Sequence, residues 1–158
     1  MRQTLEAVAL LLLLCVWGVT AYALLGQHPL LARIPTHFDV SGRPDGWGTT
    51  AMLWLLPIVA TVIYLLMTLI ALYPSAFNFP LRTTPATRPR LEAIALDMVV
   101  CLKAEVVLLF AWIQFQTIRF ARTGHASLWR GFLPAVLVVV FGTIAWHVRA
   151  MWRVGRSI

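Results

Sequence analysis

The sequence predicts an all-α membrane protein with four transmembrane helices and a structured loop between the first two. Hydrophobic residues make up 60% of the 158 positions and charged residues only 12%, whereas soluble domains have roughly half and a quarter. Mean hydropathy is +0.81, and the apolar residues gather in four runs separated by more polar segments. We therefore expect residues 1–158 to form a single integral membrane domain, with the lipid bilayer as its surroundings.

The apolar runs match the length of a membrane crossing. A helix needs about 20 mostly apolar residues to cross a hydrocarbon core of about 30 Å. Residues 7–25 and 51–73 carry no charge, the third run contains three ionisable residues, and the fourth reaches full length if Arg149 extends its side chain to the headgroups. The predicted spans are residues 5–25, 51–73, 93–118 and 131–152.

The first apolar run has an alternative interpretation as a cleaved signal peptide. Arg2 precedes the leucines, and Ala21-Tyr22-Ala23 resembles a cleavage site with small residues. However, the run is longer than the roughly 7 to 15 residues of a typical signal core. A retained helix is therefore the favoured interpretation.

The basic residues predict the orientation of the chain. The net charge of +7 could suggest nucleic-acid binding, but the arginines are scattered between apolar runs and form no basic stripe. We therefore expect no nucleic-acid partner. More arginines fall on the side that holds both termini, and basic residues favour the cytoplasmic side of a membrane. This bias places both termini in the cytoplasm and residues 26–50 outside.

The outer loop, residues 26–50, contains the most distinctive segment of the chain. Side chains two positions apart in an extended segment share a face, so His37 and Asp39 are expected to point the same way. A neighbouring carboxylate can orient an imidazole. Arg43-Pro44-Asp45-Gly46 predicts a turn, because proline presets φ and glycine suits the fourth position. Trp47 follows, where it could lie at the headgroup level.

The segment Ile34–Gly48, IPTHFDVSGRPDGWG, resembles the signature of a bacterial membrane family called domain of unknown function 1648. This family is similar to the first helical hairpin of SdpI-like immunity proteins. Phe77–Pro80 and Lys103–Glu105 resemble segments of four-helix members. The resemblance implies a multi-pass protein of the bacterial inner membrane with the loop outside. In the immunity branch it also implies protection against a secreted toxic peptide and a signal to a membrane-recruited repressor.

Several residues of the loop are candidates for recognising a ligand or partner. They are His37, Asp39, Gly42, Pro44, Asp45 and Trp47. Imidazole and carboxylate groups also suit divalent ions, although the spacing fails the pattern of an EF-hand calcium loop. The polar groups are more typical of a loop that organises its own structure than of a recognition surface, and least typical of a metal or catalytic site. Whether the loop binds a metal stays open.

The third predicted span contains Asp97, Lys103 and Glu105. Ionisable groups inside a membrane are costly, so they are candidate functional residues. Lys103 and Glu105 lie about 200° apart around a helix, so each needs its own partner. Lys103 is expected to extend toward the inner surface, and Glu105 to form a buried polar contact that fixes helix packing or lines a proton or ligand path. The candidate partners of Glu105 are His147, Arg149, Gln114 and Gln116.

The sequence favours a non-enzymatic function without a cofactor, because it has no phosphate-binding loop, zinc-protease motif or serine elbow. The leading hypothesis is an envelope sensing or immunity protein whose outer loop meets an extracytoplasmic peptide or a lipid-soluble ligand. A cytoplasmic regulator is a further candidate partner. The alternatives are a small oligomeric transporter or channel subunit that uses the third helix, and a membrane metalloenzyme.

Overall fold

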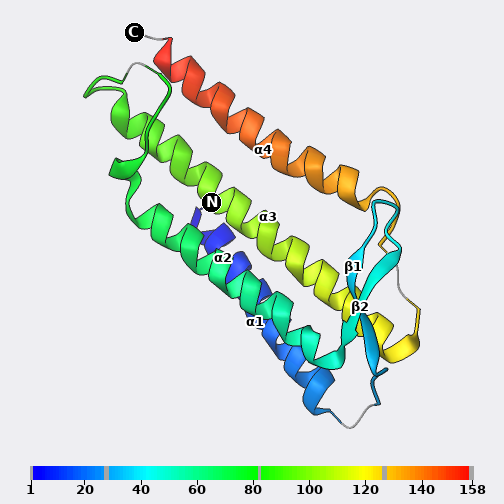
Figure 1. The fold of residues 1–158 in the computed structure, drawn as a ribbon. Coiled ribbons are helices and arrows are strands. Elements are labelled where there is room, and N and C mark those ends of the chain that lie inside the picture. The colour runs from blue at the N-terminus through cyan, green and yellow to red at the C-terminus, as the bar shows by residue number, and fades with distance from the viewer. Residues whose placement is uncertain (1, 27–28, 82, 126–127, 157–158) are drawn as a thin grey trace.

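Four long helices and a small β-hairpin make up the described part of the chain. The computed structural model describes residues 2–26, 29–81, 83–125 and 128–156. The helices are α1 (Arg2–Leu25), α2 (Leu55–Leu72), α3 (Arg88–Thr123) and α4 (Phe132–Gly155). The strands are β1 (Arg33–Phe38) and β2 (Pro44–Thr49), and short 3₁₀ helices cover η1 (Thr50–Trp54) and η2 (Pro74–Ala76). The long helices run alongside one another, with the hairpin at one end of the bundle (Figure 1).

Helix α3 is the centre of the bundle, because α1, α2 and α4 all pack against it. Helix α4 runs along one side of α3, while α1 and α2 lie on the other (Figure 1). With 36 residues, α3 is about 54 Å long at 1.5 Å per residue, so it extends beyond the predicted span of residues 93–118. Its first turn contains a proline, which needs no hydrogen-bond donor there. It ends at Gly124, whose positive φ of 71° and N–H bond to the Phe120 carbonyl form a typical helix stop.

Three of the described helices are long and apolar enough to cross a membrane: Arg2–Leu25, Thr50–Leu72 and Phe132–Gly155. They correspond to the first, second and fourth predicted spans, while α3, which carries the charged residues, is not among them. Large apolar side chains on these helices point away from the bundle, for example Leu69 of α2 and Val138 of α4, which is 73% exposed. Exposed apolar surface on this scale is typical of a protein surrounded by lipid.

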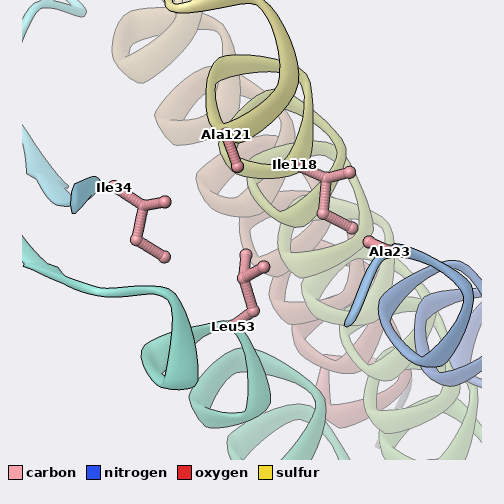
Figure 2. Close-up of a cluster of buried hydrophobic side chains, with 5 residues drawn as sticks. All are labelled: Ala23, Ile34, Leu53, Ile118 and Ala121. Carbon is pink, nitrogen blue, oxygen red and sulfur yellow. The ribbon is translucent and has the colours of Figure 1, made fainter. Parts of the chain in front are cut away.

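The hairpin corrects the expectation of an all-α fold. Strands β1 and β2 pair antiparallel, with Arg33 opposite Thr49 and Pro35 opposite Trp47. Ile34 of β1 is buried in an apolar cluster with Ala23, Leu53, Ile118 and Ala121 (Figure 2). This cluster joins the hairpin to the ends of α1 and α3 and to the start of the second crossing. The two short strands were not predicted from the sequence, because their stability depends on this contact with the helices.

The predicted turn at residues 43–46 is also corrected, since the chain reverses at residues 39–43. The Asp39 carboxylate accepts hydrogen bonds from the backbone N–H groups of Ser41 and Arg43, at 2.8 Å each, and from the Ser41 hydroxyl. Gly42 adopts a positive φ of 79°. This aspartate-centred turn leaves Pro44 free to begin β2. The Pro-Asp-Gly sequence therefore lies in a strand, not in a turn.

Gly42 offers a direct test of this turn. A Cβ atom there would lie 2.0 Å from the Leu128 carbonyl oxygen, and its positive φ disfavours any side chain. Gly42→Ala is expected to lower the free energy of unfolding by about 2 kcal/mol or more, because backbone strain and the clash add. Thermal unfolding in detergent measures the loss. The control is Gly18→Ala on α1, where a Cβ meets nothing within 4 Å; equal stability of the two variants would contradict the turn.

Candidate functional site

The polar residues of the hairpin form two separate contacts. His37 Nδ1 lies 2.5 Å from Asp45 Oδ1, with both side chains largely exposed. Asp39, the expected neighbour of His37, is engaged in the turn instead. The hydroxyl of Ser41, then the backbone N–H of Arg43, lowers the pKa of Asp39 by stabilising its charged form. The prediction of an imidazole beside a carboxylate is therefore met by Asp45 across the hairpin, and not by Asp39.

The other loop candidates have positions that explain their residue types. Gly42 forms the turn, and its carbonyl accepts a hydrogen bond from the Leu128 N–H at 2.9 Å. Pro44 begins β2. The Trp47 ring meets the Phe120 ring edge to face, with centroids 5.3 Å apart, so this tryptophan fastens the hairpin to α3. Among the residues that the structure describes, no group of three or more histidine, cysteine or acidic side chains is placed to hold a metal ion.

A cavity of about 660 Å³ lies below the hairpin. Its walls are the start of α2 on one side and the start of α4 on the other, with α3 between them. The lining is mostly apolar, as at Leu56, Ile113 and Phe132, while His37 and Asp45 contribute to the hairpin side. The hairpin therefore covers an apolar space between helices, and its His37–Asp45 contact lies at the edge of that space.

Gln114 is the polar residue of α3 that lines this cavity while fully buried. Its Nε2 donates to Thr20 Oγ1 of α1 at 2.7 Å and to the Leu53 carbonyl at 2.9 Å. Its Oε1 is buried without a hydrogen-bond partner, and such a group is costly in an apolar interior. The prediction that Gln114 is a partner of Glu105 is wrong, because its amide N–H groups bind Thr20 and Leu53. A glutamine within an apolar run was the available signal for a site of its own.

Lys103 forms the most deeply buried ion pair of the bundle. Its side chain is fully buried, and Nζ lies 2.6 Å from the Glu6 carboxylate of α1. Nζ also donates to Thr68 Oγ1 of α2 at 3.1 Å and lies 4.8 Å from the centre of the Tyr64 ring. Lys103 therefore has partners on α1 and α2 near the ends that are expected to face inward, and its extension toward the inner surface stays a prediction. Glu6 lies just before the first uncharged run, and only the packing of α1 on α3 brings it to the lysine.

A second ion pair joins the beginnings of α1 and α3. Arg2 donates through Nε to the Asp97 carboxylate and through Nη2 to the Ala93 carbonyl, the latter at 2.7 Å. The pairs Arg2–Asp97 and Lys103–Glu6 have opposite polarity, because each helix supplies one cation and one anion. The two pairs therefore specify how α1 lies along α3.

Glu105 contacts α4 and not its expected partners. Thr143 Oγ1 donates to Glu105 Oε1, whereas Oε2 is buried without a hydrogen-bond partner. His147 is one step removed, since its Nδ1 lies 2.8 Å from the Thr143 carbonyl oxygen. Glu105 also lines a second cavity, of about 400 Å³, between α3 and α4. The four candidate partners predicted from sequence are thus replaced by a threonine.

The helices and the hairpin-covered cavity define the class: a helical protein with membrane-spanning character and a small β-hairpin over one end of its bundle. Residues 9–61, about a third of the chain, match the model of the family described as Domain of unknown function (DUF1648). The matched segment is similar to that family, and it includes most of α1, the hairpin and the beginning of α2. The match confirms the resemblance noted in the loop. No curated protein and no solved structure matches the chain.

Removing one charge of the Lys103–Glu6 pair tests its role in the bundle. Glu6→Leu is expected to lower the free energy of unfolding by about 3 kcal/mol, because it leaves the fully buried Lys103 ammonium ion without its counter-charge. The double variant Lys103→Met with Glu6→Leu should regain much of that loss. Unfolding in detergent measures both. Arg88→Gln, which breaks the exposed Arg88–Glu92 pair, is the control and should cost under about 1 kcal/mol; an equal loss there would contradict the assignment.

Proposed function

We propose that the protein is a non-enzymatic receptor of the bacterial inner membrane that binds an apolar or amphipathic ligand in the cavity below the hairpin. In this proposal four helices cross the membrane, both termini are cytoplasmic and the hairpin is outside. The ligand is an extracytoplasmic peptide or a lipid-soluble molecule, and its capture serves sensing or immunity. The proposal rests mainly on the 660 Å³ cavity and on the buried Gln114 Oε1, which has no hydrogen-bond partner.

The ion pairs support a fourth crossing by α3. An unpaired charge inside a membrane is expensive, but Asp97 is neutralised by Arg2 and Lys103 by Glu6. The three apolar helices also all pack against α3, which reduces the surface that α3 exposes to lipid. Its low apolar content is then compatible with a position in the middle of a bundle. With α3 counted, the four crossings return the chain to its starting side.

The shape and chemistry of the larger cavity support ligand binding. Its volume falls within the roughly 300–1,000 Å³ of small-molecule sites, which are mostly apolar with a few polar groups. Gln114 Oε1 can accept a hydrogen bond from a peptide N–H or a hydroxyl group. His37 and Asp45 can contact a polar end of the same ligand at the hairpin. An amphipathic molecule matches this division between an apolar interior and a polar edge.

The transporter alternative has less support from the arrangement of α3. A path needs polar groups that follow one another along a common surface. Asp97 and Lys103 instead pair with α1, and Glu105 contacts α4. Asp97 and Lys103 thus lie in the interface with α1, whereas Glu105 lies in the interface with α4, so the three groups do not follow one common surface. The arrangement therefore favours a fixed bundle over a polar channel.

Filling the cavity tests the proposed function. Cells that produce the protein are challenged with a panel of membrane-active peptides, and survival is compared with that of cells lacking it. Ile113→Trp, which places an indole in the cavity, is expected to reduce survival to the level of cells without the protein, because the ligand can no longer enter. Ile58→Trp on α2 is the control, since Ile58 is outward-facing and does not line the cavity.

Protein levels in the membrane must be equal for the comparison to hold. Full protection by Ile113→Trp at normal levels would contradict the proposed function. Absence of protection by the unaltered protein against every peptide of the panel would also contradict the immunity role.

A further inference from the structure

The second cavity adjoins the first, since Leu109, Phe132 and Val136 line both, but it differs in chemistry. It lies between α3 and α4 and is enclosed mainly by apolar side chains such as Leu109, Trp112 and Val139. Leu109 and Trp112 follow Glu105 by four and seven residues, so they share its face of α3. Glu105 supplies the one ionisable group of the lining. The space is therefore an apolar compartment with a single carboxylate.

Glu105 differs from the other ionisable residues of the predicted third span in having no partner of opposite charge among the described residues. Asp97 and Lys103, the other two ionisable residues of the predicted third span, each have a partner of opposite charge. The described partner of Glu105 is instead the neutral hydroxyl of Thr143. Glu105 Oε2 is buried with no hydrogen-bond partner. An unpaired carboxylate with an unsatisfied oxygen is strongly disfavoured in an apolar medium, so the site is complementary to a cation that can donate a hydrogen bond.

The surroundings of Glu105 restrict the chemistry of that cation. A divalent metal ion prefers several oxygen or nitrogen ligands, and no cluster of three candidate side chains occurs in the described residues. A hydrated inorganic cation would have to shed its water molecules on entry. The leucine and valine side chains of the walls offer no ligands to replace them. An ammonium ion on an apolar body avoids this cost, because the body contacts the walls while the N–H groups reach the carboxylate. The ring of Trp112 can add a cation–π attraction.

We propose that the cavity between α3 and α4 binds a lipophilic primary ammonium ion, which donates a hydrogen bond to Glu105 Oε2. This goes beyond the proposed function, because the ligand contacts the Glu105 carboxylate and not the Gln114 amide, and because it must carry a positive charge. The ligand enters from the bilayer, since α4 packs mainly on α3 and its other faces carry exposed apolar residues such as Val138 and Phe141. Thr143 holds the carboxylate toward the cavity through Oε1.

Binding of radiolabelled dodecylamine at neutral pH tests this site. The full chain is placed in lipid nanodiscs, and dodecanol, a neutral molecule with the same chain, serves as the comparison ligand. The unaltered protein is expected to bind the amine saturably and at least tenfold more tightly than the alcohol. Glu105→Gln should remove this preference, because the amide is neutral and cannot pair with the ammonium ion. Glu92→Gln, an exposed carboxylate at the start of α3, is the matched control and should retain the preference.

A second variant keeps the test decisive if Glu105→Gln does not fold. Val139→Trp retains the carboxylate but fills the cavity, so it is expected to abolish saturable binding of the amine. Equal affinity for amine and alcohol in the unaltered protein would overturn the proposal. Unchanged amine binding by Glu105→Gln or by Val139→Trp would also overturn it, and the Glu105–Thr143 contact would then serve only to join α3 to α4.

Discussion

The bundle depends on the neutralisation of charges that α3 carries into an apolar setting. Lys103 is fully buried and is held by Glu6, Thr68 and the face of Tyr64, so α1 and α2 both contribute to one contact. Buried ion pairs seldom add stability compared with apolar packing, but breaking one is costly. The Lys103–Glu6 pair therefore acts mainly by selecting one arrangement of three helices. The Arg2–Asp97 pair, with reversed polarity, fixes the same arrangement at the beginnings of α1 and α3.

The position of the hairpin follows from that arrangement. Once α1 and α3 are aligned, their far ends present Ala23 and Ala121, against which Ile34 packs (Figure 2). Small residues at these positions let the hairpin approach closely. The hairpin then reaches across toward α4, where the Gly42 carbonyl accepts a hydrogen bond from Leu128. A cavity remains below it because α2 and α4 lie on different sides of α3. The candidate binding site is thus a consequence of helix packing and hairpin length together.

Much of the bundle could be predicted from the sequence, since runs of about 20 apolar residues correspond directly to α1, α2 and α4. The outer loop also stands out through a local feature, the Ile34–Gly48 motif. The partners of its residues were not predictable, because an alternation such as His37 and Asp39 assumes a straight strand, whereas Asp39 turns the chain and Asp45 returns opposite His37. Long-range pairs were missed for a related reason. Glu6 and Lys103 are 97 positions apart, and only the packed helices bring them together.

The proposed crossing of the membrane by α3, as the middle helix of four spans, can be measured by thiol labelling. Single cysteines replace Ser75, before α3, and His125, after it, in a background with Cys15 and Cys101 replaced by alanine. An impermeant thiol reagent applied to intact cells should label the cysteine at position 125, and should label the one at position 75 only after permeabilisation. Labelling of both positions in intact cells, or of neither, would show that α3 does not cross. The reverse pattern would contradict the cytoplasmic placement of the termini.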